Sequence, residues 1–144
     1  MKMLLFLCTG NYYRSRFAEL YFRHLAVKHE LRWLVDSRGL ELHPANEGPL
    51  SQHAIIECQR MGISTEPLRL PTALQENDLK SAHLVIAVKE TEHRPLMRQQ
   101  FPDWQNWIEY WEVHDLDVAP PQEALSRLRQ HVESLIERLR SQSS

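Results

Sequence analysis

The chain has 144 residues, of which 42% are hydrophobic and 25% are charged, as in a soluble globular protein with a core of its own. Lys and Arg number 17 against 19 Asp and Glu, so the formal net charge of −2 argues against nucleic acid or a membrane surface as the main partner. The apolar run of residues 3–7 is too short for a signal peptide or a membrane span, and two cysteines make no disulfide framework. We therefore expect a cytoplasmic protein.

Apolar and amphipathic segments alternate along the chain. In order, the expected elements are a strand at residues 2–8, a helix at 15–28, a strand at 31–37, a loop at 38–49, a helix at 51–61, a strand at 82–88, a helix at 91–101, an edge strand at 107–113 and a final helix that begins near Pro120 and Pro121. This alternation predicts an α/β fold, a three-layer αβα sandwich around a four-stranded parallel sheet. Residues 1–144 form one domain in this interpretation, without linker or repeat.

The stretch "CTGNYYRSR", which begins at Cys8, joins the first strand to the first helix. Ligands of open α/β sheets bind at this edge, where a helix N-terminus offers unpaired N–H groups to an anion. Gly10 and Asn11 tolerate the positive φ angles of a tight loop. The planar guanidinium of Arg14 can bind two phosphate oxygens, and Ser15 can donate a hydrogen bond to sulfur. We expect an ionised Cys8, so that a nucleophile and an oxyanion site share one loop.

Cysteine, five residues, arginine and serine resemble the active-site signature of the protein tyrosine phosphatases. With Gly10 and Asn11 near the N-terminus, the stretch resembles the low-molecular-weight branch, and the resemblance extends over the whole chain, loosely in its middle. It implies a phosphatase P-loop between strand and helix, with Cys8 as nucleophile, Arg14 as phosphate ligand and Ser37 as support for Asn11. The substrate-binding residues that it implies are Thr9, Gly10, Asn11, Tyr12, Tyr13 and Ser15.

The same resemblance implies a general acid on the loop after the fourth strand. Asp115 and Asp117 are candidates, although neither precedes a proline as the acid of the family usually does. Asp115 fits the spacing better, and Asp117 is the alternative acid or a residue that helps to start the last helix. The implied reaction is hydrolysis of phosphotyrosine, in a protein or a small aryl phosphate, through a cysteinyl-phosphate. No cofactor and no metal are expected, and phosphate-like anions should bind the same loop.

Several positions depart from the family pattern. Tyr12 replaces a residue that is often aliphatic, and it either stacks on a substrate ring or half-covers the pocket. Tyr13 replaces a second loop cysteine, so no disulfide is expected within the loop, and Cys58 is expected to pack inside. Leu116 and Val118 follow the candidate acid where the family typically carries tyrosines. The substrate preference is therefore less specified than the chemistry.

Four other functions compete with this interpretation. Phosphoarginine phosphatases of this family carry a small Thr at the position of Tyr12, which makes that activity the less favoured alternative. A non-catalytic phosphate- or phosphopeptide-binding module would need neither Cys8 nor an acid. An arsenate reductase needs two further cysteines, and only Cys58 remains. A phosphocysteine carrier should not hold the arginine that promotes hydrolysis.

Overall fold

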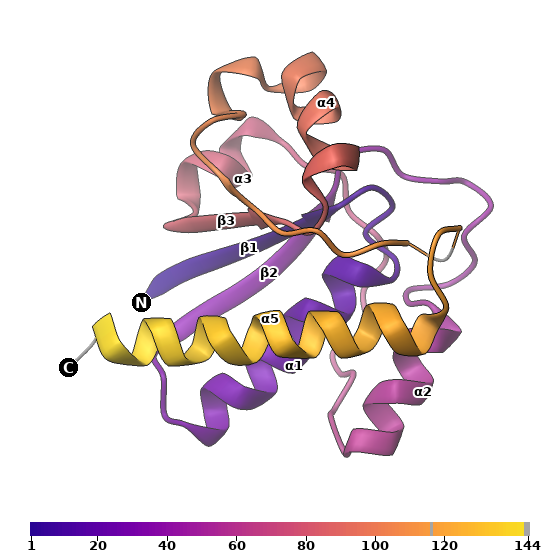
Figure 1. The fold of residues 1–144 in the computed structure, drawn as a ribbon, viewed down its shortest axis with the longest axis vertical. Coiled ribbons are helices and arrows are strands. Elements are labelled where there is room, and N and C mark those ends of the chain that lie inside the picture. The colour runs from indigo at the N-terminus through magenta and orange to yellow at the C-terminus, as the bar shows by residue number, and fades with distance from the viewer. Residues whose placement is uncertain (116, 143–144) are drawn as a thin grey trace.

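The computed structural model describes residues 1–115 and 117–142. Its elements are β1 (Lys2–Cys8), α1 (Arg14–Lys28), β2 (Trp33–Gly39), α2 (Gln52–Met61), α3 (Glu76–Ser81), β3 (Leu84–Ala87), α4 (Glu90–Gln100), a 3₁₀ turn (Pro102–Trp104), β4 (Glu109–Tyr110) and α5 (Pro121–Gln142). The four strands form one parallel sheet in the order β2-β1-β3-β4. Figure 1 shows α1, α2 and α5 on one side of the sheet and α3 and α4 on the other. The expected three-layer α/β fold is confirmed.

Successive side chains of β1 point to opposite faces of the sheet, and each face has its own core. Leu4 and Phe6 pack with the apolar residues of α1, α2 and α5. Leu5 and Leu7 pack with those of α3 and α4. Because β1 is buried on both faces and paired on both edges, its carboxyl end is held in place from four sides.

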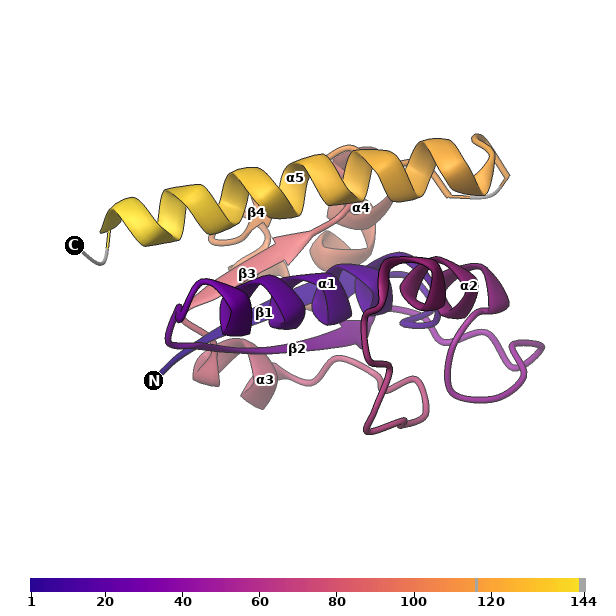
Figure 2. The same ribbon diagram turned by 90° about the horizontal axis from the view of Figure 1, so that it is seen from below.

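The order of the strands creates a ligand site at that carboxyl end. The chain leaves β1 through α1 to β2 on one edge, and β3 lies on the other edge. The loops that follow β1 and β3 therefore diverge, which opens a crevice at Cys8, as expected at the switch point of an open α/β sheet. Figure 2 shows that α5 lies along α1 and that its first turns lie beside α2.

The last strand is shorter than the sequence predicts. Only Glu109–Tyr110 pair as a strand, although residues 107–113 were expected to do so. The backbone continues along β3 through hydrogen bonds from Trp111 N–H to Ala87 O (2.9 Å) and from Val113 N–H to Val88 O (2.8 Å). Through these irregular pairings the segment after β4 stays beside the end of β3 as far as Val113, and so it reaches the crevice.

The helix α3 was not expected, because its six residues bury a single apolar side chain, Leu79, and so show no helical period. A capping box of Gln75 and Asp78 begins it. Ser51 caps the first turn of α2, which was expected at residues 51–61, and the left-handed Gly62 (φ 71°) ends it. Within the described part of the chain, none of the helices is long and apolar enough to cross a membrane.

Candidate active site

The thiol of Cys8 lies at the end of β1 with two hydrogen-bonding partners from the following loop. Its Sγ is 2.9 Å from Ser15 Oγ and accepts a hydrogen bond from Asn11 N–H (3.3 Å). Asn11 adopts the positive φ (50°) that was expected, whereas Gly10 does not. A side chain at Gly10 would instead crowd Asn46, since an added Cβ would lie 3.2 Å from its Nδ2. Gly10 therefore serves close approach and not a left-handed turn.

The backbone after β2 fixes the orientation of the loop. The carbonyls of Cys8 and Thr9 accept hydrogen bonds from the N–H groups of Leu40 (3.0 Å) and Glu41 (2.9 Å). A carbonyl and the N–H of the next residue in a trans peptide point in opposite directions. The N–H of Gly10 consequently points away from residues 40 and 41.

Asn11 is fully buried and binds the loop to its surroundings with both ends of its side-chain amide. Nδ2 donates to Ser15 Oγ (2.9 Å) and Ser37 Oγ (2.8 Å). Oδ1 accepts from Nη1 of Arg69 (2.9 Å), and the hydroxyl of Ser37 donates to Glu19 (2.5 Å). The structure thus places Ser37 beside Asn11, and it adds Arg69 and Glu19, which the sequence did not indicate.

The guanidinium of Arg14 is 2% exposed, and Glu92 holds it by a bidentate ion pair. Nη1 and Nη2 donate to the two Glu92 oxygens at 3.2 and 2.7 Å, and Nη1 also donates to Val113 O (3.0 Å). Asp115 Oδ2 lies 3.3 Å from Nη2. Burial opposes the charge, but Glu92, Cys8 and Asp115 outweigh it and raise the pKa of Arg14.

Thr9 and His93 complete the surroundings of Glu92. The hydroxyl of Thr9 donates to the carboxylate, and His93 Nε2 is 3.2 Å from it. His93 Nδ1 accepts from the N–H of Lys89 (3.1 Å), so the proton of the neutral ring is on Nε2 and points to Glu92 and Thr9. Burial lowers the pKa of His93, which keeps the ring neutral. Burial alone would raise the pKa of Glu92, but the hydrogen bonds from His93 and Arg14 hold it far below its usual range.

A cavity of about 410 Å³ opens above Cys8. Tyr12, Tyr13 and His53 give it aromatic walls, and Asp115 lies at its edge with 42% of its side chain exposed. Tyr12 donates its hydroxyl proton to Glu47 O (2.6 Å), which fixes one wall. Burial, aided by Asp115, raises the pKa of Tyr13 to about 12, so this phenol stays neutral.

Asp117 is exposed and does not line the cavity, whereas Asp115 does. Asp117 also does not cap α5, because that helix begins four residues later at Pro121. Leu116 lies outside the described residues, and Val118 is exposed. Cys58 is fully buried on α2, where burial raises the pKa of its thiol to about 11.

Four buried or half-buried ionisable residues of the site escaped sequence analysis, namely Glu19, Arg69, Glu92 and His93. Glu92 and His93 follow β3 and so reach the same sheet edge as Cys8. Ionisable residues that come directly after a predicted strand are a signal that could have found them. Arg69 has no such signal, since its segment between α2 and α3 has no regular pattern. Across the described residues, no group of three or more His, Cys, Asp or Glu side chains is arranged to hold a metal ion.

A thiol, a buried arginine and a carboxylate meet at the carboxyl edge of a parallel sheet, which is the arrangement of an α/β enzyme with a cysteine nucleophile in an oxyanion-binding loop. Residues 3–143 match the sequence model described as low molecular weight phosphotyrosine protein phosphatase. The chain belongs to the low molecular weight phosphotyrosine protein phosphatase family, whose members hydrolyse phosphate monoesters.

Individual relatives agree with this assignment. The chain is 30% identical to a protein-arginine-phosphatase of Bacillus subtilis (strain 168). The aligned 105 residues are 73% of this chain and 67% of the relative. It is 27% identical to the low molecular weight protein tyrosine phosphatase of T. tengcongensis, with a TM-score of 0.80 over 96% of this chain and 99% of that one. YfkJ of Bacillus subtilis has the same fold, with a TM-score of 0.88 over 100% and 98% of the two chains at 24% identity.

Proposed function

We propose that this phosphatase hydrolyses phosphotyrosine and related aryl phosphates, with Cys8 as nucleophile, Arg14 as phosphate ligand and Asp115 as general acid. The observation that carries this proposal is the meeting of these three side chains at one cavity with aromatic walls. The Nε–H edge of Arg14, which no hydrogen bond of the described residues uses, is available to a phosphate oxygen. The N–H groups of the loop add neutral donors to the same oxyanion.

The reaction proceeds in two displacements at phosphorus. The Cys8 thiolate attacks, the S–P bond forms, and the P–O bond to the leaving group breaks while Asp115 donates its proton to the leaving oxygen. Water then attacks the cysteinyl-phosphate, gives a proton to the Asp115 carboxylate and releases inorganic phosphate and the thiolate. The hydrogen bonds from Asn11 N–H and Ser15 stabilise the thiolate at the start and the end of the cycle.

The walls of the cavity support an aromatic leaving group. Tyr12 and His53 line the cavity with aromatic rings that can pack against a phenyl group. Hydrolysis of phosphoarginine is the second candidate, because a relative that is 30% identical is named a protein-arginine-phosphatase. Its guanidinium group is planar but charged, and it would have to lie between the same rings.

The substrate proposed is a phosphorylated protein or a small aryl phosphate, and free phosphate-like anions are expected to bind the same loop. We also infer a cytoplasmic location. Two free, buried cysteines, Cys8 and Cys58, support it, since such thiols are typical of a reducing compartment.

A hydrolysis panel tests this function. Wild-type protein should hydrolyse p-nitrophenyl phosphate and phosphotyrosine peptides at least about tenfold faster than phosphoserine or phosphoarginine peptides, measured as kcat/KM. Cys8→Ser should abolish turnover. Asp115→Asn should slow substrates with poor leaving groups by about a hundredfold, whereas Asp117→Asn should have little effect. A preference for phosphoarginine would replace the proposed substrate, and a strong effect of Asp117→Asn alone would replace the proposed acid.

A further inference from the structure

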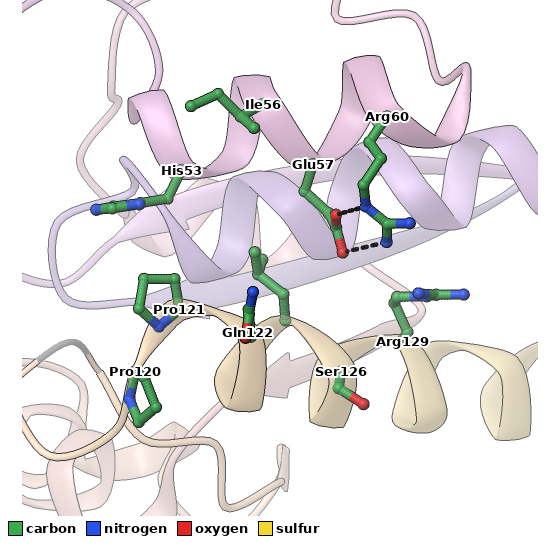
Figure 3. Close-up of a pocket in the computed structure, with 10 residues that line it drawn as sticks. His53, Ile56, Glu57, Arg60, Pro120, Pro121, Gln122, Ser126 and Arg129 are labelled. Carbon is green, nitrogen blue, oxygen red and sulfur yellow. Dashed lines mark hydrogen bonds and ion pairs between the residues drawn. The ribbon is translucent and has the colours of Figure 1, made fainter.

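A second and larger cavity, about 730 Å³ in volume, lies between α2 and the first turns of α5. The two helices face each other across this groove, as Figure 3 shows, and the mechanism above makes no use of it. Ile56 lies on the α2 side with 59% of its surface exposed, and Leu125 and Pro121 lie on the α5 side. The groove thus combines an apolar lining with free access from solvent.

The groove adjoins the catalytic cavity, because His53 lines both. Its ring packs edge-on against Tyr13, with 6.0 Å between the ring centroids, and the Tyr13 hydroxyl donates to Pro121 O (3.4 Å). A polypeptide whose phosphorylated residue enters the cavity above Cys8 would cross the side chains of Tyr13 and His53 to reach the space between the helices.

The end of the groove away from His53 is basic. Figure 3 places Arg60 and Arg129 there, with His53 and Pro121 at the opposite end. Glu57 is bonded to Arg60 (2.6 and 3.0 Å), whose hydrogen bonds lower the pKa of Glu57. Arg129 contacts the Tyr21 hydroxyl, and its buried Nε has no hydrogen-bond partner among the described residues. Among the residues that line the groove, two guanidinium groups stand against one carboxylate, and Glu133 lies behind Arg129 on the hydroxyl of Tyr21. The surface that faces the groove therefore has an excess of positive charge.

The length of the groove sets the position of a complementary charge. His53 and Arg60 are seven residues apart on α2, and Pro121 and Arg129 are eight apart on α5. At about 1.5 Å per helical residue, both separations are about 10–12 Å. An extended chain covers that length in about three residues at roughly 3.3–3.6 Å each. His53 lines the catalytic cavity itself, so we count about one residue between the phosphorylated residue and the start of the groove.

We propose that this groove binds the polypeptide that flanks the phosphorylated residue of a protein substrate, and that Arg60 and Arg129 select an Asp or Glu about four positions away. The inference rests on the proposed phosphatase function and adds the class of substrate to it. The preferred substrate is a phosphorylated segment with an acidic flank. An isolated phosphotyrosine occupies only the catalytic cavity.

The test compares phosphotyrosine peptides that differ at one flanking position. Each has Glu, Gln or Lys four residues before or after the phosphotyrosine, in an otherwise neutral sequence. For one of the two directions, wild-type kcat/KM should be about three- to tenfold higher with Glu than with Gln, and lower with Lys. The Arg60→Gln, Arg129→Gln double variant should lose this preference, as should wild-type protein at high salt.

Arg127→Gln is the matched control, because Arg127 is exposed on α5 but does not line the groove. This control should keep the preference, and all variants should hydrolyse p-nitrophenyl phosphate at the wild-type rate. Equal rates with the Glu, Gln and Lys peptides, together with normal p-nitrophenyl phosphate hydrolysis, would contradict the proposed role of the groove in substrate binding. The proposed phosphatase function would remain.

A preference for Glu that survives in the double variant would also contradict the proposal. If wild-type protein hydrolyses none of these substrates, the proposed phosphatase function is wrong, and so is the role of the groove that rests on it. If a variant fails to fold, the discrimination of the wild-type protein among the peptides still decides the question.

Discussion

Arg14 is the residue on which the site depends most, and Glu92 fixes its orientation. Glu92 binds both Nη nitrogens of the guanidinium, so the planar group cannot rotate away from Cys8. Thr9 and His93 in turn hold the Glu92 carboxylate. A guanidinium that is already oriented loses little conformational entropy when it binds a phosphate, which is the benefit of such a support.

Replacement of Glu92 by Gln should impair catalysis without removing any group that touches the substrate. One terminal atom of the neutral amide is an NH₂ donor, so Gln cannot accept from both Nη nitrogens of Arg14 through two oxygens as Glu92 does. We expect kcat/KM for p-nitrophenyl phosphate to fall roughly ten- to a hundredfold. Glu92→Asp, which keeps the charge, should restore part of the loss. Glu90→Gln is the control, because Glu90 lies on the same helix but pairs with Arg94 at the surface (2.8 Å). Equal losses in the two Gln variants would contradict the positioning role.

The same carboxylate should make stability depend on pH. Its pKa is depressed in the folded protein, so its stabilising contribution is complete above the pKa of the unfolded chain and is lost as pH falls toward the folded value. Urea unfolding of wild-type protein between pH 7 and pH 3 should therefore show a steeper loss of stability than that of Glu92→Gln. If the stabilities of wild-type and Glu92→Gln protein fall in parallel with pH, the pKa of Glu92 is not lowered by its partners in the folded protein.

At the scale of elements, Arg69 connects three parts of the fold to the loop. It projects from the segment between α2 and α3 and binds Asn11 of the loop, Glu19 of α1 (3.2 Å) and Asp36 of β2 (3.0 Å). Asp36 has a lowered pKa although burial opposes this, because the N–H of Ser37 and nearby arginines stabilise its charge. One side chain thus sets the position of Asn11 relative to the helix and the strand on which the loop rests.

Arg69→Met should therefore affect stability and activity together. It leaves the buried Glu19 and the half-buried Asp36 without this partner, and we expect the free energy of unfolding to fall by roughly 1–3 kcal/mol in urea titrations. The kcat for p-nitrophenyl phosphate should fall as well, because Asn11 loses a donor. Arg23→Met is the control: Arg23 also binds this segment, at Glu66 O (2.8 Å), but does not reach the loop. A loss of stability with an unchanged kcat would make Arg69 a structural residue only.

At the scale of the whole molecule, ligand binding and folding are coupled. Cys8, Glu92 and Asp115 follow β1, β3 and β4 respectively, so the site exists only when the sheet is formed. An anion that binds this site binds the folded protein and not the unfolded chain. It must therefore raise the free energy of unfolding.

Inorganic phosphate at about 100 times its Kd should stabilise the protein by about 2.7 kcal/mol. For a domain of this size the corresponding rise in Tm is about 5–10 °C, measured by calorimetry. Cys8→Ser should keep this rise, since the loop and the arginine remain. Arg14→Lys should lose most of it, because an ammonium group cannot replace the planar fork. An unchanged shift in Arg14→Lys would place the anion elsewhere on the protein.

The sequence was informative where chemistry is local. The apolar runs of β1 and β3 and the helical period of α5 identified the layers, and "CTGNYYRSR" identified the loop because its residues are contiguous. The sequence analysis missed α3 and predicted β4 too long, since neither element has enough residues to display a period. Spacing favoured Asp115 but left Asp117 as an alternative, because the two are only two residues apart and the fold decides which carboxylate reaches the cavity.

By itself the sequence determined the alternation of strands and helices apart from α3, the family and the residues of the loop, since these depend on neighbours in the chain. Only the tertiary structure decided that Glu92 clamps Arg14, that Arg69 reaches Asn11, and that α2 and α5 enclose a groove beside the catalytic cavity. These contacts join residues about 60 to 80 positions apart. Their partners are chosen by how the elements pack, and no local pattern of residues encodes that choice.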